Sequence, residues 1–529
     1  MIKIEFLSQK RWVDWIAVAL IGLLLQGFWA VRMSQPTYMD AYYYTTNGQR
    51  LADGYGFTEE VIWQFLDEPA GFPTPSHSYW MPLTSILAAG GYLFGEGFRA
   101  VQAPFWLLAG LLPVLAYAIS CTLGQSRWVR WTAALFTASG GFYNNFYNQP
   151  ATFALFAWTG GLCLLALAKG STQGRVRQGR VRQGRVRWWW LLAGILAGLG
   201  HLTRADGMLL VLIGGLVALS GWRATAEYRR IGVRLSLLGI GYFSVMGGWF
   251  GHNWELFGRP LSTVGTQTVF LTIYDDLFAY GRSFDLSHFL AWGWPNIMQS
   301  RLTGLSTAFQ TFIAINCLIF LVPFVLWAWW QLGKTKWPML RPFTCYAAVL
   351  YVSMSLLFTF PGVRGGLFHS SAALFPWTMS LAAAGIPMVV NWAATKLPHW
   401  QPVRAGRLFA GLFVVVAMIM TFSLGLVRTP ELSETAVYET IGTHLPPDAV
   451  VMSGNAPGFY YHTGFPSVSV PNEPPEVLRQ AAEKYGVTYL VLDADRPVPL
   501  DGLYAGVLQV AGIQLLSDYD GIKLYRINK

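Results

Sequence analysis

A single carboxylate, Asp40, stands among four tyrosines in the segment 38–44. Aromatic neighbours exclude water from a carboxylate, and this tunes its pKa toward proton abstraction. Asp40 is therefore a candidate catalytic base, and Tyr42 and Tyr43 are candidates for contact with the substrate. The alternative is structural, because Asp is also favoured as the N-cap of a helix, and residues 41–51 are predicted to be helical.

Further along the same segment, His77 follows five acidic residues, which are Asp53, Glu59, Glu60, Asp67 and Glu68. Carboxylates and imidazoles are metal ligands, but the spacing of these residues matches no ligand signature. We therefore expect most of these acids to be solvated surface residues, and we expect neither a metal site nor another cofactor. His77 is a candidate for contact with the substrate.

Asn148 and Gln149 belong to a cluster of amides at 144–149 that precedes Pro150. Amide side chains donate and accept hydrogen bonds, so both residues are candidates for binding the hydroxyls or the phosphate of a substrate. They could equally satisfy backbone groups at the end of a helix.

Two arginines are candidates for binding a phosphate. Arg364 is followed by two glycines, which let its guanidinium and the nearby backbone N–H groups approach a phosphate closely, and His369 lies five residues further on. Arg204 lies between two apolar runs, where ionisable residues are costly and commonly functional. The alternative for Arg204 is a structural ion pair with Asp206.

Long apolar runs must hold these residues in place. Of the 529 residues, 53% are hydrophobic and only 12% are charged, whereas soluble domains carry roughly 25% charged residues. A soluble protein is excluded, because repeated runs of about 20 apolar residues can cross a bilayer. Glycines and alanines in several runs allow close helix packing. About eleven spans are predicted, at 13–31, 100–123, 131–146, 151–169, 188–202, 207–221, 234–253, 308–330, 343–360, 371–390 and 408–427.

The placement of Lys and Arg predicts the orientation of these spans. Most of the 37 basic residues lie in alternate short loops, including the arginine repeat at 175–187, and such loops are typical of the cytoplasmic side. The N-terminus is therefore inside, provided that the short segment 80–95, which contains Pro82, does not cross the bilayer. The net charge of +10 reflects these loops and not a nucleic-acid partner. The first outer loop then runs from 32 to 99.

After residue 428 the apolar runs end. The remainder has short strand-like runs at 449–453, 467–470, 488–492 and 522–527, and a helical pattern at 475–485. The predicted fold is an all-α polytopic membrane bundle at 1–428 followed by a small α/β domain at 429–529. Because eleven spans follow an inside start, this domain and the polar loops are expected outside the cytoplasm, at the plasma membrane.

Three of these features recur together in one superfamily. They are Asp40 just past the first span, a first outer loop that ends in Trp80-Met81-Pro82-Leu83, and the outer run Leu202-Thr203-Arg204-Ala205-Asp206-Gly207. On these motifs, residues 10–430 resemble the GT-C membrane glycosyltransferases, nearest to the protein mannosyltransferases and the lipid A aminoarabinose transferase.

The resemblance implies transfer of a hexosyl or pentosyl group from a polyprenyl-phosphate donor to a lipid, glycan or protein acceptor at the outer face of the membrane. Asp40 would be the general base, and Arg204 or Arg364 would lie near the carrier phosphate. Many relatives carry an acidic residue in the second outer loop, where this chain has Asn148-Gln149-Pro150. An amide cannot bind a divalent cation as a carboxylate does, so we expect activity without a metal.

Two other classes of protein remain open. A transporter or flippase for polyprenyl-linked glycans would also have many spans, although the sequence shows no paired inverted repeats. A non-catalytic protein of envelope assembly would bind the donor without turnover. Sugar transfer in liposomes excludes the non-catalytic protein.

Overall fold

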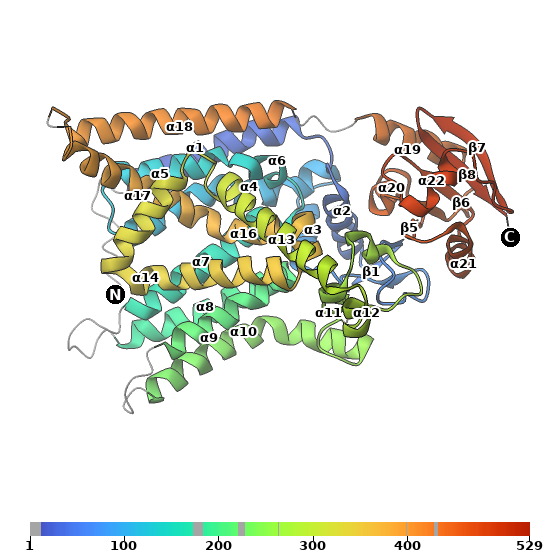
Figure 1. Ribbon diagram of the computed structural model, residues 1–529, viewed down its shortest axis with the longest axis horizontal. Helices are drawn as coiled ribbons and strands as arrows, with labels where there is room; N and C mark the ends of the chain where they lie inside the picture. Colours follow the sequence, from blue (N-terminus) through green and yellow to red (C-terminus); the bar gives the residue numbers. More distant parts are fainter. Residues whose placement is uncertain are drawn as a thin grey trace. The chain divides into compact units, whose positions relative to one another are not determined.

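The computed structural model describes residues 12–172, 183–220, 228–262, 264–397, 399–427 and 432–528. Contacts divide the chain into two compact units (Figure 1). The first, which we call the helical unit, comprises Met1–Ser34, Gln102–His252 and Arg301–Arg428. The second, which we call the mixed unit, comprises Gln35–Val101, Asn253–Ser300 and Thr429–Lys529. Most of the arginine repeat at 175–187 lies outside the described residues.

The helical unit is built from long apolar helices and several short helical turns. Its long helices are α1 (Trp12–Arg32), α4 (Gly97–Thr122), α5 (Arg127–Ser139), α7 (Thr152–Thr172), α8 (Gln183–Thr203), α9 (Met208–Leu219), α10 (Tyr228–Phe257), α13 (Trp294–Gln310), α14 (Val322–Leu356), α17 (Phe375–Ala394) and α18 (Pro402–Val427). The boundary between the two units falls inside α4, α10 and α13. The short elements are η1 (Gly141–Tyr143), α6 (Asn144–Tyr147), η3 (Ala205–Gly207), the π-helical turns η7 (Thr311–Asn316) and η8 (Gly362–Gly366), α15 (Thr359–Pro361), α16 (Leu367–Ser371) and η9 (Ala372–Leu374).

Among the described residues, six helical stretches are long and apolar enough to cross a membrane. They are Trp12–Arg32, Gly97–Thr122, Thr152–Thr172, Tyr228–Phe257, Thr359–Ala394 and Pro402–Leu426. These helices indicate a multi-pass membrane protein. The predicted number of eleven spans stays a prediction. Two of the predicted spans correspond to short helices, because α5 has 13 residues and α9 has 12.

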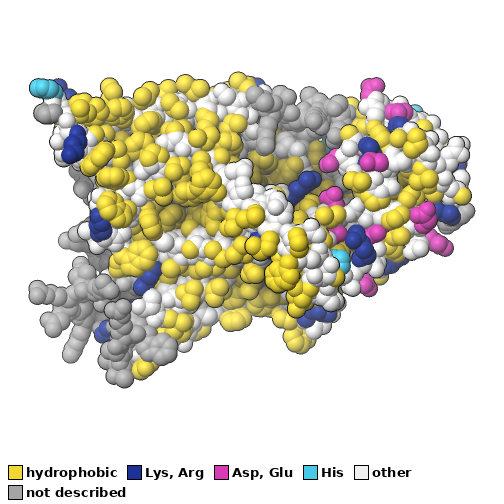
Figure 2. Space-filling view, viewed as in Figure 1, with side chains coloured by type: hydrophobic (Ala, Val, Ile, Leu, Met, Phe, Trp, Pro, Cys, Tyr) yellow, Lys and Arg dark blue, Asp and Glu magenta, His cyan; other side chains and the backbone are white. Residues whose placement is uncertain are grey.

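Small residues allow the helices of this unit to pack closely, as the glycines and alanines in the predicted spans indicated. A side chain at Gly194 would collide with the carbonyl of Leu238, and one at Gly241 would collide with the carbonyl of Leu191. These two glycines therefore set the approach of α8 and α10. On the outside, α18 exposes large apolar side chains such as Leu408 and Ile419, at 70% and 61%. Figure 2 shows apolar side chains over much of the visible face of this unit.

The predicted spans at 308–330 and 343–360 meet in helix α14, which consists of two helices separated by a kink where Lys336 leaves the helical conformation. The chain folds back at this kink, because Trp329 Nε1 donates to Thr344 Oγ1 at 2.9 Å across it. Pro338 and Pro342 follow the kink, and proline cannot donate the backbone hydrogen bond that a regular helix needs. The sequence pattern placed a loop here because basic residues and prolines interrupt the apolar run.

The mixed unit combines short helices with two sheets. Its helices are α2 (Met39–Ala52), α3 (Leu83–Tyr92), α11 (Val264–Gln267), η5 (Thr268–Phe270), η6 (Tyr274–Phe278), α12 (Leu286–Ala291), α19 (Leu432–His444), α20 (Ala456–Thr463), α21 (Pro475–Tyr485), η10 (Val498–Leu500) and α22 (Asp501–Tyr504). Its strands are β1 (Thr58–Glu59), β2 (Val61–Ile62), β3 (Thr74–Pro75), β4 (Val451–Ser453), β5 (Ser467–Ser469), β6 (Tyr489–Leu492), β7 (Ile513–Tyr519) and β8 (Ile522–Ile527). Helix α3, in the segment predicted not to cross the membrane, has ten residues, about half of what a span needs.

The larger sheet joins the two ends of the mixed unit's sequence. Its six strands have the order β2-β5-β4-β6-β8-β7, and β1 pairs with β3 in the smaller sheet. Strand β2 from the first loop runs parallel to β5, with Val61 opposite Ser467. Ile62 and Phe65 are buried in one core with Leu478 of α21. The strands and the helix predicted after residue 428 are therefore present, and the first loop completes their sheet. The domain boundary at 428 stays a prediction.

Candidate functional site

Arg204 lies between α8 and η3 and is engaged by two short segments of the helical unit. Its Nε donates to Asp206 Oδ1 at 3.0 Å and to Ser370 Oγ at 2.9 Å, and its Nη2 donates to the carbonyl of Gly366 at 3.4 Å. Ser370 Oγ in turn donates to Asp206 Oδ2. The structural ion pair considered from the sequence is thus present, and it fastens η3 to α16. A phosphate-binding role for Arg204 stays a prediction.

Arg364 lies on the π-helical turn η8, and its side chain is exposed. Gly365 has a φ of 141°, a conformation that residues with a side chain rarely adopt. A side chain at Gly366 would come within 2.7 Å of the carbonyl of Pro361. Glycines are therefore required at this turn, which presents Arg364 on the surface and offers the Gly366 carbonyl to Arg204. The two candidate arginines are therefore neighbours in the structure, because Arg364 lies on this turn and Arg204 donates a hydrogen bond to it.

His369 lies on α16, and two residues of the neighbouring helix α7 hold its side chain. Its Nδ1 lies 2.8 Å from Thr152 Oγ1, and its ring stacks on Phe153 with 3.9 Å between the centroids. These contacts fix the orientation of the imidazole two residues after α16 begins. Binding of the donor by His369 stays a prediction.

Asn148 and Gln149 are completely buried in a polar network among the helices. Asn148 Nδ2 donates to Gln26 Oε1 at 2.8 Å, Gln102 Nε2 donates to the carbonyl of Asn148 at 2.9 Å, and Gln149 Nε2 donates to the carbonyl of Asn145 at 3.2 Å. The amides therefore tie α1, α4 and α6 together, and Gln149 satisfies a backbone carbonyl of α6, as in the structural alternative. Binding of a substrate by Asn148 and Gln149 stays a prediction. Sequence reasoning missed Gln26 and Gln102, although a lone polar residue in an apolar span is a signal for such a network.

An apolar groove of about 390 Å³ opens between α13, η7, α14 and the start of α17. Its lining includes the aromatic side chains of Phe309, Phe312 and Phe343. Its polar members include Asn316 and Tyr351, whose hydroxyl donates to Asn316 Oδ1. Asn316 Nδ2 donates to the carbonyl of Ser371 at 3.2 Å. Ser371 follows Ser370, which bonds to Arg204, so the groove lies next to the contacts of Arg204. Arg204 also bonds to the turn η8 that carries Arg364, and we call these two arginines the arginine cluster. Four separate segments form the groove, so no local pattern could have predicted it.

In the mixed unit, Asp40 lies in the first turn of α2 and is half-buried. The helix begins at Met39, so the N-cap position belongs to Tyr38, which makes no capping hydrogen bond with its side chain. The interpretation of Asp40 as the N-cap residue is therefore wrong. A carboxylate in the first turn still interacts favourably with the helix dipole.

Tyr43 and His77 are core residues of the mixed unit. Tyr43 is 1% exposed, and its hydroxyl accepts a hydrogen bond from the backbone N–H of His77 at 2.8 Å. The imidazole of His77 lies 2.7 Å from Ser76 Oγ and 2.9 Å from Ser85 Oγ. These contacts join α2, the first loop and α3. Tyr42 points to a different neighbour, helix α20, where its ring lies 5.1 Å from that of Tyr461.

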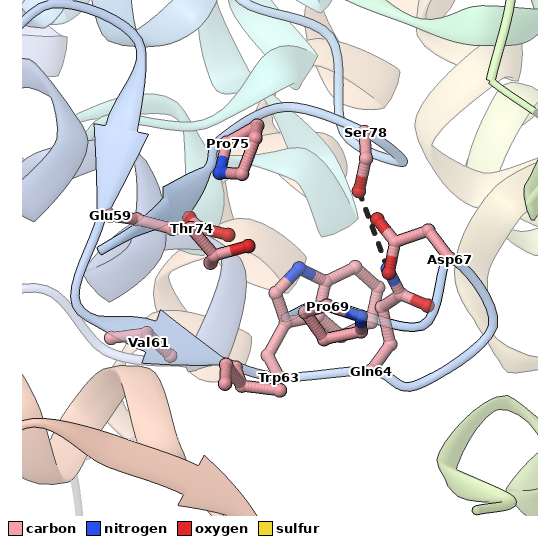
Figure 3. Close-up of a pocket in the computed structure, with 10 residues that line it drawn as sticks. Glu59, Val61, Trp63, Gln64, Asp67, Pro69, Thr74, Pro75 and Ser78 are labelled. Carbon is pink, nitrogen blue, oxygen red and sulfur yellow. Dashed lines mark hydrogen bonds between the residues drawn. The ribbon is translucent and has the colours of Figure 1, made fainter. Parts of the chain in front are cut away.

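Two of the five acids in the first loop are withdrawn from solvent, Glu59 fully and Asp67 partly. Glu59 is 5% exposed and accepts a hydrogen bond from Asn47 at 3.2 Å, and burial raises the pKa of its carboxyl well above the usual range. Burial also raises the pKa of Asp67. Figure 3 shows both carboxylates at a small cavity, with Gln64 beside Asp67. The cavity measures about 10 Å³, roughly the space of one water. The expectation that most of these acids are solvated therefore fails for Glu59, while Asp53 and Glu68 are exposed.

The buried Glu59 leads to a prediction about stability and pH. Because its pKa is raised in the folded state, its contribution to stability is present below the unfolded pKa and is lost as the pH rises through the folded pKa. Glu59→Gln keeps the shape without the charge, so we expect higher melting temperatures than wild type at pH 8–9 and equal ones near pH 4. Removing the cost of a buried charge should raise the free energy of unfolding by about 1–2 kcal/mol, which corresponds to a rise in melting temperature of roughly 3–6 °C. Glu68→Gln is the matched control, since Glu68 is exposed. A pH-independent difference would contradict the prediction.

Among the described residues, no three His, Cys, Asp or Glu side chains are grouped closely enough to hold a metal ion. Activity without a metal stays a prediction.

No protein-family model and no curated protein matches the chain, but solved structures do. The archaeal oligosaccharyltransferase AglB from Archaeoglobus fulgidus, in complex with an inhibitory peptide and a dolichol-phosphate, matches with a TM-score of 0.58 and 11% identity over 99% of this chain and 75% of AglB. ArnT from Cupriavidus metallidurans bound to undecaprenyl phosphate matches with a TM-score of 0.55 and 14% identity over 98% of both chains. Both are GT-C membrane glycosyltransferases. The chain therefore has the GT-C fold, as the resemblance in its sequence predicted.

Proposed function

We propose that the chain is a glycosyltransferase that moves a sugar from a polyprenyl-phosphate donor to a lipid, glycan or protein acceptor at the outer face of the membrane. The observation that carries the proposal is the pairing, within the helical unit, of an apolar groove with an arginine cluster. A polyprenyl phosphate is a long apolar chain with an anionic head, so it needs both surfaces. AglB and ArnT were solved with dolichol-phosphate and undecaprenyl phosphate, which are lipids of this class.

The phosphate would be held at the turn η8. Arg364 is exposed there, and a guanidinium can donate two parallel hydrogen bonds to a phosphate. The charge of Arg204 is partly compensated by Asp206 at 3.0 Å, so it would contribute mainly by holding η8 and α16 in place. Arg364 is therefore the stronger candidate for direct contact with the phosphate.

The chemistry requires a base at the acceptor and positive charge at the leaving group. The oxygen of the acceptor hydroxyl forms a bond to the anomeric carbon, and the bond from that carbon to the phosphate oxygen breaks. Asp40 would take the proton of the hydroxyl, and the arginine would stabilise the charge that develops on the phosphate. Hydrolysis of a nucleotide is not needed, because the donor already carries the leaving group.

Transfer by purified protein in liposomes tests the proposal. The liposomes would contain radiolabelled polyprenyl-phosphate sugars, offered with extracts of envelope lipids, glycans and proteins, and the measurement is label moved from carrier to acceptor. Label that only crosses the bilayer would instead identify a transporter or flippase. Donor binding without either event would identify a non-catalytic assembly protein.

If the groove holds the lipid tail of the donor, the KM for the donor should depend on the length of that tail. Ala347→Phe adds a ring to the lining, so we expect the KM for a long-chain donor to rise roughly tenfold, equal to about 1.4 kcal/mol of lost binding. A donor with only two isoprene units should be unaffected. Val352→Phe is the control, because Val352 lies on the same helix and is 55% exposed. An equal loss for long and short donors would show that the groove does not hold the chain.

A further inference from the structure

We infer that the C-terminal segment 432–528 positions helix α2, and with it Asp40, through the contact of Tyr42 with Tyr461 and His462 on α20. This inference rests on the proposed function, because it gives that segment a part in the same transfer. His462 and Tyr461 are positioning residues and not catalytic ones, since they act through α2.

The contact consists of a hydrogen bond and two ring contacts. His462 Nε2 lies 3.4 Å from the hydroxyl of Tyr42. The ring centroids of Tyr42 and His462 are 5.4 Å apart, and those of Tyr42 and Tyr461 are 5.1 Å apart. Tyr42 is 7% exposed, so these neighbours enclose it. Tyr42 lies two residues after Asp40 on the same helix, and a shift of its ring therefore moves the turn that carries the carboxylate.

His462 is itself held from a second helix. Glu439 Oε1 on α19 lies 3.7 Å from its Nδ1, and the side chain of His462 is only 5% exposed. A carboxylate beside Nδ1 favours the proton on that nitrogen, which leaves Nε2 to accept from the hydroxyl of Tyr42. Glu439, His462 and Tyr42 thus form a chain of polar contacts from α19 through α20 to α2.

Other contacts keep α20 in place against the first loop. Strand β5, which follows α20, pairs with β2 of that loop. Ala456, the first residue of α20, is buried in one cluster with Tyr43, Tyr44 and Trp63. The C-terminal segment is therefore attached to α2 and to the loop after it at several points, which makes it part of the frame that holds Asp40.

The contact also predicts a dependence on pH. The titratable groups that face His462 among the described residues are Glu439 from α19, Tyr42 from α2 and Tyr461 from its own helix. Burial lowers the pKa of His462, so the neutral form predominates at neutral pH. Protonation in acid would turn Nε2 into a donor, and the hydrogen bond would have to reverse, because a tyrosine hydroxyl can also accept. It would also place a charged imidazole at a site where the side chain is only 5% exposed, which weakens the contact. Transfer should therefore fall in acid.

The test uses the purified full chain with His462→Leu, His462→Gln and Tyr42→Phe. We expect His462→Leu to lower kcat by roughly tenfold or more, because small displacements of reacting groups are costly, while the KM for the donor stays unchanged. Amide hydrogen exchange in 39–52 should become faster. Gln can accept from Tyr42 without titrating, so His462→Gln should restore most of kcat and remove the part of the acid limb that is due to His462, while the part due to the general base remains. Tyr42→Phe keeps the ring and its contacts, so we expect it to lower kcat less than His462→Leu does.

His444→Leu is the matched control, because His444 is an exposed histidine at the end of α19. Unchanged exchange in 39–52 of His462→Leu would overturn the inference, whether or not the protein transfers sugar. Faster exchange with a wild-type kcat would overturn it as well. If His462→Leu does not fold, His462→Gln and Tyr42→Phe decide by the same two readouts. Absence of transfer by wild type would count against the proposed function, and the exchange measurement would still test the contact.

Discussion

Asp40→Asn is expected to lower sugar transfer by roughly 100-fold or more while leaving the protein folded. The substitution keeps the size of the side chain and removes its basicity. Asp40 lies in the first turn of α2 and not at its N-cap, so the loss of its charge should cost only about 0.3–1 kcal/mol of stability. Turnover and folding are thus separable at this position.

The measurement is transfer from a polyprenyl-phosphate sugar by purified wild type and variant, with melting temperatures recorded in parallel. Asp53→Asn provides the control, because Asp53 is an exposed acid at the other end of the same helix. It should retain wild-type turnover. Near-normal turnover by Asp40→Asn would remove Asp40 from the chemistry and leave it as a residue that stabilises the start of α2.

The second large effect is expected at Arg364. A bidentate guanidinium contact with phosphate is not replaced by the point charge of an ammonium group. Arg364→Lys should therefore reduce transfer by roughly 10- to 100-fold, equal to about 1.4–2.8 kcal/mol, and Arg364→Ala should reduce it further. Because the side chain is exposed, the melting temperature should not change. Full activity of the Lys variant would exclude the bidentate role.

Arg204 provides the contrasting case. Arg204→Ala would leave Asp206, whose side chain is 13% exposed, without its partner at 3.0 Å, and losing one member of a buried pair costs roughly 3 kcal/mol or more. We expect that cost as a lower melting temperature. The double variant Arg204→Ala/Asp206→Ala removes both charges and should recover much of the stability. If it also recovers transfer, Arg204 serves only the fold; if transfer remains lost, Arg204 acts on the phosphate as well.

Residues near one another in the sequence were the ones whose arrangement could be predicted. Apolar runs of about 20 residues predict membrane helices, since length and hydropathy decide that partition. The strands and the helix after residue 428 follow from local periodicity, and the Arg364-Gly365-Gly366 turn follows from the conformations that glycine allows. Asp40 at the start of a helix was predicted too, although the N-cap residue was not, because cap positions depend on contacts beyond the local pattern. The order of these motifs was enough to indicate the GT-C fold.

Tertiary structure alone decided what surrounds these residues. Glu59 is a buried carboxylate and Glu68 an exposed one, and nothing in their immediate sequence separates them. The groove draws on segments from Ala308 to Thr378, and β2 pairs with a strand some 400 residues away. His462 carries no motif, yet it reaches the helix of Asp40. Burial and pairing of this kind depend on contacts between distant parts of the chain, and a local pattern records only which face of an element is apolar, not what covers it.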